Sequence, residues 1–244
     1  LICSESPEQI FNEISKLEFI LEYRLAFEGR RLIKDIYYDT DDQLLSKRKW
    51  ALRIRTIDSQ RLITVKGPTN VDHQSAERLE LEEFLSSSTL EKIQQMLSIH
   101  QIAVNLPESF DPLEGIFHAN SGLKIIQQRS TTRAIFGVYT DVEEQVAELA
   151  LDRVQFHLQG KNVIHNEIEI ESLKAGGEQA GRKIADYLLV KYGPALKRWD
   201  FGKLATGIAL QKLFATYPAA DLLSQGNHIK SKAYQRIAAI LEMH

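Results

Sequence analysis

The chain has 244 residues, of which 43% are hydrophobic and 26% are charged, as in an ordinary globular protein with a sizeable core. Its formal net charge of -3 excludes recruitment through overall positive charge, so we expect no nucleic-acid partner and no membrane partner. The one cysteine, Cys3, excludes a disulfide framework and a cysteine-based zinc site, and it indicates a reducing, cytoplasmic location. No apolar run reaches the roughly 18 residues of a membrane span.

The first predicted element is an amphipathic helix. Ser6 and Pro7 form a helix-start signal, and Ile10 and Ile14 recur at helical spacing. After Gly29 the spacing of apolar residues changes to two, which predicts antiparallel strands separated by turns. The candidate strands cover residues 32–38, 50–57, 62–66, 78–84, 123–129, 133–140, 146–157 and 162–172.

Helical patterns also occur between and after these strands. Residues 88–99 predict a helix inserted between the fourth and fifth strands, and residues 107–120 are rich in loop signals. The helical pattern returns after Gly177 and again in residues 203–214 and 229–243. The sequence therefore predicts an α+β protein with a strand-rich centre and a helical end.

Charged residues recur at every second position of several predicted strands, so they share one face of each strand. Arg53 and Arg55, for example, alternate with Leu52 and Ile54. The other such sets are Thr64 with Lys66, Arg78 with Glu80 and Glu82, Glu148 with Asp152, and Glu167 with Glu169 and Glu171. For any one strand, the ordinary interpretation is the solvated face of a half-buried sheet.

The sorting of these charges by sign favours a second interpretation. Arg53 and Arg55 are both basic, whereas Glu167, Glu169 and Glu171 are all acidic, and neighbouring like charges repel unless something neutralises them. A divalent cation would neutralise the carboxylates, and guanidinium groups can bind phosphate oxygens in pairs. If the sheet closes on itself, both sets point into one cavity suited to a polyanion and its metals.

The same residues form a series of motifs that resembles the CYTH superfamily, also called triphosphate tunnel metalloenzymes. The matching segments, in the family's order, are Ile36 to Thr40, Trp50 to Arg55, Ile63 to Gly67, Glu77 to Glu82, Leu149 to Asp152 and Asn166 to Glu171. The resemblance runs from about residue 1 to residue 210. It implies a closed eight-stranded antiparallel β-barrel, the triphosphate tunnel, with a charged interior and helices packed outside.

The resemblance also implies roles for individual residues, together with Mg²⁺ or Mn²⁺ as the cofactor. The phosphate-holding catalytic residues would be Arg53, Arg55, Lys66 and Arg78. Further substrate-binding residues would be Arg129, Arg133, Lys197 and Arg198. The metal ligands would be Glu80, Glu82, Asp152, Glu167, Glu169 and Glu171.

The chain departs from the family's pattern in two places. Arg198 replaces the lysine of the family's Ser-Lys-aromatic element, and an arginine presents a planar fork rather than a point charge. The family opens with a Glu-x-Glu-x-Lys strand, and Leu1 corresponds to the residue just after that lysine. We expect this strand to lie upstream of Leu1, because a closed tunnel needs it.

The function implied is metal-dependent hydrolysis of inorganic triphosphate or a small organic triphosphate. The alternatives are a class IV-type adenylate cyclase and a non-catalytic module that binds polyphosphate. We expect a tunnel domain over residues 1–213 and a helical C-terminal extension over residues 214–244. The extension could be the remnant of a longer helical domain, a linker, or a packing helix in a homodimer.

Overall fold

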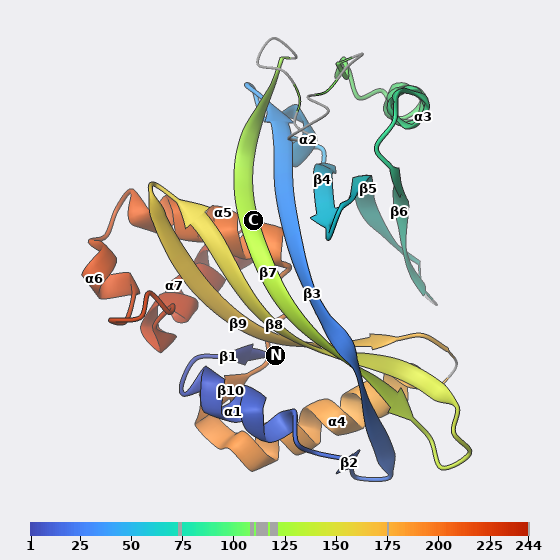
Figure 1. Cartoon of the computed structure of the whole chain (residues 1–244). Coiled ribbons are helices and arrows are strands. Elements are labelled where there is room, and N and C mark those ends of the chain that lie inside the picture. Colours follow the sequence, from blue (N-terminus) through green and yellow to red (C-terminus); the bar gives the residue numbers. More distant parts are fainter. Residues whose placement is uncertain (73–74, 108–109, 111–116, 118–121, 175, 244) are drawn as a thin grey trace. The chain divides into compact units, whose positions relative to one another are not determined.

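A computed structural model describes residues 1–72, 75–107, 110, 117, 122–174 and 176–243, and between residues 69 and 78 the side chains lie outside the description. The chain divides into two compact units, residues 33–129 and residues 1–32 together with 130–244 (Figure 1). We name them by their place in the sequence: the central unit is the continuous middle stretch, and the outer unit is formed by the two flanking stretches.

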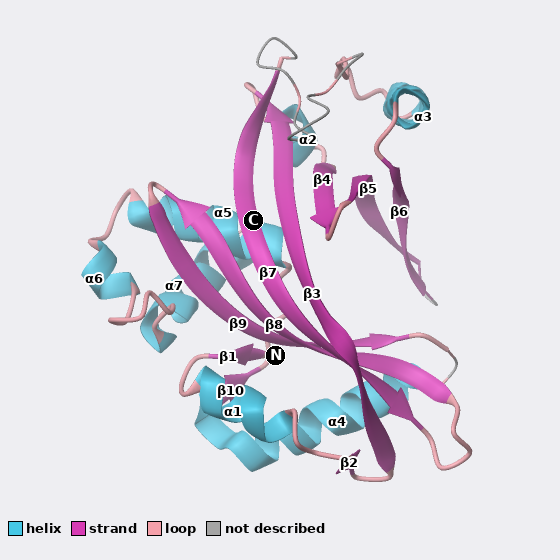
Figure 2. Cartoon of the chain, in the orientation of Figure 1, coloured by secondary structure: helices cyan, strands magenta, loops and turns pink. Residues whose placement is uncertain are grey.

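The middle of the chain is rich in strands and its C-terminal part is mostly helical, as the sequence predicts (Figure 2). The strands are β1 (Ile2–Cys3), β2 (Phe19–Ile20), β3 (Tyr23–Thr40), β4 (Ala51–Ile57), β5 (Gln60–Asp72), β6 (Ser75–Phe84), β7 (Leu123–Tyr139), β8 (Gln145–Leu158), β9 (Lys161–Ser172) and β10 (Leu196–Lys197). The helices are α1 (Pro7–Ile14), α2 (Leu44–Lys47), α3 (Ser87–Ile99), α4 (Gly177–Tyr192), η2 (Gly193–Ala195), α5 (Lys203–Phe214), α6 (Ala219–Leu222) and α7 (Ser231–Glu242). The predicted strands at residues 123–129 and 133–140 are one strand, β7.

The expected closed eight-stranded barrel is wrong. The structure has a ten-stranded sheet in the order β10-β1-β9-β8-β7-β3-β4-β5-β6, with β2 paired to β3. Closure requires hydrogen bonds between the two end strands. Within the described residues β10 pairs only with β1 and β6 only with β5, so the sheet is open. Alternation of polar and apolar residues occurs in open and in closed sheets alike, and it could not distinguish them.

In the central unit, α3 covers the apolar side of β4 and β5. The alternation places Leu52, Ile54 and Ile63 in one cluster with Ile93 and Leu97 of α3, all of them buried. Burying each such side chain stabilises the fold by about 1.5–3 kcal/mol. The opposite side of the same strands therefore carries the charged residues.

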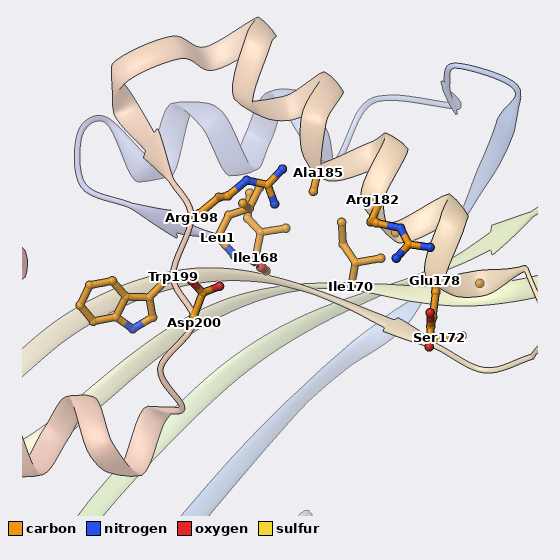
Figure 3. A pocket seen from close by; sticks show the side chains of 12 residues that line it. Leu1, Ile168, Ile170, Ser172, Glu178, Arg182, Ala185, Arg198, Trp199 and Asp200 are labelled. Carbon is orange, nitrogen blue, oxygen red and sulfur yellow. Dashed lines mark hydrogen bonds between the residues drawn. The ribbon is translucent and has the colours of Figure 1, made fainter. Parts of the chain in front are cut away.

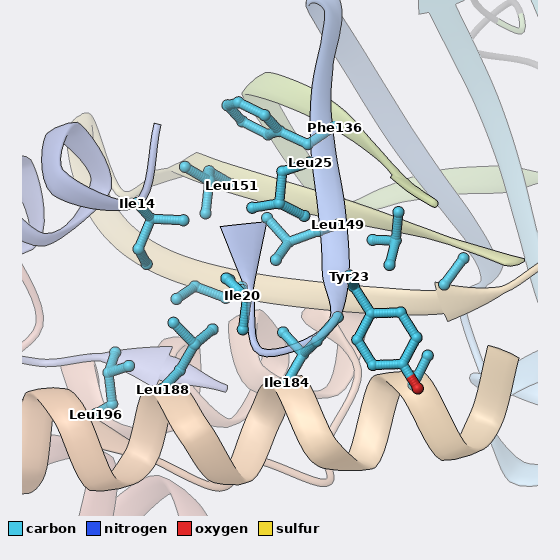
Figure 4. Close-up of a cluster of buried hydrophobic side chains, with 14 of the residues drawn as sticks. Ile14, Ile20, Tyr23, Leu25, Phe136, Leu149, Leu151, Ile184, Leu188 and Leu196 are labelled. Atoms are coloured by element: carbon cyan, nitrogen blue, oxygen red, sulfur yellow. The ribbon is translucent and has the colours of Figure 1, made fainter. Parts of the chain in front are cut away.

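In the outer unit, α1 and α4 cover one face of β8 and β9 (Figure 4). Leu149 and Leu151 of β8 pack in one buried cluster with Ile168 of β9 and with Ile184 and Leu188 of α4. Strand residues two apart share a face, so this face holds the odd-numbered apolar residues of β8 and the even-numbered ones of β9.

The other face of β8 and β9 is charged along part of its length and apolar beyond it. Asp152 lies opposite Glu167, whereas further along the hairpin Phe156 lies opposite Val163. Phe156 and Val163 pack with Leu210 and the other buried side chains of α5, α6 and α7. The C-terminal helices therefore cover the continuation of the carboxylate-bearing face, and their ends can reach the carboxylates.

A tight turn sets the register that pairs these residues. Gln159 and Gly160 connect β8 to β9 with φ values of 48° and 75°. Two successive positive φ values are typical of a type I′ hairpin turn, which favours glycine. A slip by one residue would move every carboxylate to the apolar face.

Candidate functional site

Three arginines of the central unit converge on the carboxylate of Asp35 on β3. Arg55 donates from Nε to Oδ1 at 2.7 Å and from Nη2 to Oδ2 at 3.0 Å. Arg129 donates to Oδ2 from Nε at 3.1 Å and from Nη2 at 2.9 Å. Arg53 adds an ion pair, with its Nε 3.8 Å from Oδ1 of an Asp35 side chain that is 2% exposed. We call these four residues the arginine cluster.

Burial alone would raise the pKa of Asp35. The hydrogen bond from Arg55 and the positive charges of Arg129 and Arg53 outweigh that effect, so the pKa lies well below the usual range of an aspartate. Asp35 is therefore an anion at physiological pH. It fixes the planes of the guanidinium groups and partly neutralises them.

Further contacts of the arginine cluster come from neighbouring strands. Arg53 donates from Nη2 to Glu82 Oε2 at 2.8 Å and to Thr64 Oγ1 at 3.1 Å. Arg129 donates from Nη2 to the hydroxyl of Tyr37 at 2.8 Å. Burial would raise the pKa of Glu82, but the hydrogen bond from Thr64 and the charge of Arg53 lower it. Glu82 is therefore a partner of Arg53 here.

Two more residues of the predicted site lie on β5 and β6. The ammonium of Lys66 is 2.7 Å from Oε1 of Glu80, and the two residues are opposite each other in the strand ladder. Arg78 belongs to β6 and pairs with Thr69, and its side chain lies outside the described residues.

A second cluster, in the outer unit, is centred on Lys203 at the start of α5. Its ammonium lies 3.0 Å from Asp152 Oδ2 and 3.1 Å from Glu167 Oε2, and it also donates to Glu169. Burial would lower the pKa of Lys203, but the three carboxylates outweigh that effect and raise it. The lysine is therefore a cation enclosed by carboxylates.

Arg133 on β7 completes this carboxylate cluster. It donates from Nε to Asp152 Oδ1 at 2.8 Å and from Nη2 to Asp152 Oδ2 at 2.6 Å, and it also contacts Glu169. Three carboxylates and two cations thus interlock on one face of the strands. Arg133 is engaged with carboxylates in the structure rather than presented to a phosphate.

Glu167 has a further partner behind it. The fully buried ring of His165 lies between Glu167 Oε2, 3.1 Å from Nε2, and the hydroxyl of Tyr234, 2.8 Å from Nδ1. Burial would raise the pKa of Glu167, but His165 and Lys203 lower it from the usual 4.5 to about 2. Tyr234 belongs to α7, so the C-terminal helices hold a carboxylate of the cluster in place.

Three more of the predicted residues also lie apart from the two clusters. Glu171 is exposed and lies opposite Glu148 in the hairpin. Lys197 donates to Ser231 Oγ at 2.6 Å. Arg198 is 59% exposed and pairs with Asp186.

Two hollows border β9. One of about 380 Å³ lies between β9 and α4, with Ile168 and Ile170 on one side and Arg182 of α4 on the other (Figure 3). The second, of about 320 Å³, is lined by Glu167 and Glu169 among others. The second hollow therefore borders the carboxylate cluster.

The carboxylates do not form a metal site as they stand. Within the part of the chain that the structure describes, no group of three or more His, Cys, Asp and Glu side chains is arranged to hold a metal ion. The reason is visible in the contacts, because the ammonium of Lys203 lies where the oxygens of Asp152, Glu167 and Glu169 converge. Glu80 and Glu82 are likewise paired with Lys66 and Arg53.

The sequence of the chain matches a known family. Residues 7–197, well over half of the chain, match the CYTH domain. The chain therefore belongs to the CYTH domain family, whose members include triphosphatases and cyclases, bind triphosphate substrates and generally depend on divalent metal.

Solved structures resemble the fold at low sequence identity. A Bacillus halodurans protein, provisionally described as an adenylate cyclase, has a TM-score of 0.51 at 23% identity, covering 84% of this chain and 93% of that one. A Hippeastrum protein described provisionally as an adenylyl cyclase, with a dominant triphosphatase activity, has a TM-score of 0.48 at 16% identity, covering 84% and 91%. A Pyrococcus horikoshii protein has a TM-score of 0.45 at 21% identity, covering 88% and 98%. No curated protein matches the chain.

Three residues central to the clusters were not among the predicted site residues. Asp35 could have been found, because it lies two residues before Tyr37 on β3, in phase with the charged face of β4. Lys203 has no signal of its own, since a lysine at the start of a helix is ordinary. His165 is not part of the charged pattern, and it is a buried hydrogen-bonded residue.

Proposed function

We propose that this CYTH protein binds a triphosphate-bearing small molecule and hydrolyses it. Water adds to a phosphorus atom, a phosphoanhydride P–O bond breaks, and a triphosphate becomes a diphosphate and a phosphate. The observation that carries the proposal is the convergence of Arg53, Arg55 and Arg129 on one point of the central unit.

The arginine cluster is suited to phosphate oxygens for two reasons. A guanidinium has five N–H groups, and Asp35 accepts two from Arg55 and two from Arg129. Arg129 also donates to Tyr37 and Gln127, whereas Arg55, 21% exposed, keeps further N–H groups that can donate to a phosphate. Bidentate contacts between a guanidinium and a phosphate are among the strongest in proteins. Because Asp35 fixes the guanidinium planes, little side-chain freedom is lost on binding.

The family resemblance adds a divalent cation, Mg²⁺ or Mn²⁺, to the reaction. In the present arrangement Asp152, Glu167 and Glu169, three of the carboxylates expected to hold it, are paired with Lys203 and Arg133. We therefore assign no step to the metal, and its requirement is part of the test.

The pairing of these carboxylates with Lys203 and Arg133 favours a second candidate, a module that binds polyphosphate without hydrolysing it. Carboxylates that are compensated by protein cations need no metal, and binding through arginines alone requires none. The two functions differ in turnover and share their ligand.

The test is phosphate release from inorganic triphosphate, ATP and thiamine triphosphate, each with Mg²⁺, with Mn²⁺ and with EDTA. We expect Arg55→Gln to lower kcat/KM at least tenfold, since the variant loses a guanidinium that we propose to contact the phosphate. The matched control is Arg48→Gln, whose side chain is exposed in the same unit, and it should stay within twofold of wild type.

Each other outcome selects a different function. Triphosphate binding without phosphate release in any metal would overturn hydrolysis in favour of the binding module. Cyclic AMP among the ATP products would identify a cyclase. Equal losses in Arg55→Gln and Arg48→Gln would show that the arginine cluster is not the binding site.

A further inference from the structure

We propose that Lys203 is the resident counter-cation of the carboxylate cluster and competes with a divalent cation for the oxygens of Asp152, Glu167 and Glu169. This inference rests on the proposed function only for the choice of cation.

The first step of the argument is geometric. The ammonium of Lys203 contacts carboxylates from two adjacent strands, at 3.0 Å from Asp152 and 3.1 Å from Glu167, and it donates to Glu169. Asp152 and Glu167 are directly opposite each other in the β8–β9 ladder. A cation placed among these oxygens is at the centre of the negative charge on this face.

The second step concerns charge. Three carboxylates facing Lys203 and Arg133 leave a cluster with one unit of negative charge. Without the lysine the cluster would carry two units, which one divalent cation would neutralise. Carboxylate oxygens are the ligands that Mg²⁺ and Mn²⁺ prefer. Removal of the lysine would therefore leave a site suited to a divalent cation, and the ammonium group occupies that site in the wild-type chain.

The third step concerns how the backbone and the side chain of Lys203 are held. Its backbone is fixed, because α5 packs through Ala209, Leu210 and Leu213 against the apolar continuation of the carboxylate face. Its side chain, 9% exposed, is a flexible four-carbon stem, so the ammonium can withdraw without movement of the helix. The hollow of about 320 Å³ beside β9 borders two of the same carboxylates, Glu167 and Glu169.

A lysine that served only to stabilise the fold would predict something different. Its replacement would lower stability and leave affinity for divalent cations unchanged. A competing lysine predicts that the replacement raises this affinity. Cation affinity in the absence of substrate therefore separates the two roles.

The experiment is Mn²⁺ binding to the full chain, followed by electron paramagnetic resonance of free Mn²⁺ with no triphosphate present. We expect Lys203→Met to lower the Kd for Mn²⁺ at least tenfold relative to wild type. Lys203→Arg keeps the charge and should bind Mn²⁺ no better than wild type. Lys212→Met removes an exposed lysine from the same helix and should leave the Kd within twofold.

Lys203→Met leaves buried charge uncompensated and could fail to fold without metal. The double variant Lys203→Met, Glu169→Gln keeps the net charge of the wild-type cluster, and we expect its Kd for Mn²⁺ to be at least threefold lower than that of wild type. Mn²⁺ affinity in these folded variants no greater than in wild type would overturn the proposal. Because no triphosphate is used, a failure of hydrolysis leaves this result unaffected.

Discussion

Arg129 on β7 donates two hydrogen bonds to the same oxygen of Asp35 on β3, from Nε at 3.1 Å and from Nη2 at 2.9 Å. On the other side of β3, Arg55 of β4 binds both oxygens of that carboxylate. One buried anion thus links cations from the strands on either side of it. Removing one partner of a buried ion pair is far more costly than replacing the whole group, because it leaves the other charge uncompensated.

The first prediction follows from that asymmetry. Asp35→Asn leaves Arg53, Arg55 and Arg129 close together with no anion between them, so we expect the free energy of unfolding to fall by about 3 kcal/mol. Urea denaturation followed by circular dichroism measures the change. Asp41→Asn is the control, since that side chain is 92% exposed and its surface pair with Lys124 should contribute less than about 1 kcal/mol. Equal losses in the two variants would contradict a special role for Asp35.

A second prediction concerns pH and Glu167. The pKa of Glu167 is lowered from 4.5 to about 2 by folding, so its contribution to stability is fully present above about pH 5 and is lost as the pH falls toward 2. We expect the free-energy difference between wild type and Glu167→Gln to shrink by about 3 kcal/mol over that range.

The measurement is urea denaturation of both proteins at several pH values between 2.5 and 7 (about half a unit apart). Glu171→Gln serves as the control, because Glu171 is exposed on the same strand, and a surface substitution of this kind should change the free energy of unfolding by less than about 0.5 kcal/mol. A Glu167→Gln difference that does not depend on pH would show that the ion pairs of Glu167 do not stabilise the fold.

A third prediction concerns the one cysteine. Burial raises the pKa of the Cys3 thiol from 9.0 to about 12, and its side chain lies in the core formed with α1 and α4. Only the thiolate reacts with disulfide reagents. We expect Ellman's reagent at about pH 8 to react at least roughly 100-fold more slowly with the folded chain than with the chain unfolded in guanidinium. Comparable rates would mean that β1 opens readily.

A fourth prediction contrasts two glycines of α4. A Cβ on Gly177 would lie 2.3 Å from the carbonyl oxygen of Val146, so Gly177→Ala requires the backbone to move and should destabilise the fold by about 2 kcal/mol or more. A Cβ on Gly181 would meet only the side chain of Ile170, at an ordinary 3.4 Å. Gly181→Ala should therefore be neutral or stabilise the helix by up to about 1 kcal/mol. Thermal unfolding of both variants tests the contrast, and equal effects would contradict it.

Much of the local structure could be predicted from sequence because alternation is a local property. The shared face of Arg53 and Arg55 is confirmed by burial of Leu52 and Ile54 on the other side. Helix α3 was predicted at residues 88–99, and it covers Ser87–Ile99. Neighbouring residues determine these features through their spacing, so no distant contact needs to be known.

The pairing of charges could not be predicted in the same way. Arg129 binds Asp35 from 94 positions away, and Lys203 binds Glu169 from 34 positions away. Such partners depend on which strands become neighbours in the sheet. Each strand carries charges of mostly one sign, but neighbouring strands bring charges of opposite sign together. The prediction of a closed sheet is wrong for the same reason. Closure requires the two end strands to pair with each other, and the sequence of one strand does not determine its partner.

The two parts of the outer unit are synthesised at different times. It is assembled from residues 1–32 and 130–244, whereas the central unit is one continuous stretch, residues 33–129. As the chain leaves the ribosome, the central unit is complete first, while α1 must wait for α4 and the carboxylate face for Lys203 and Tyr234. Contacts that are far apart in sequence form slowly and leave apolar strands exposed meanwhile. The face that carries the carboxylates is therefore among the last parts of the molecule to be completed.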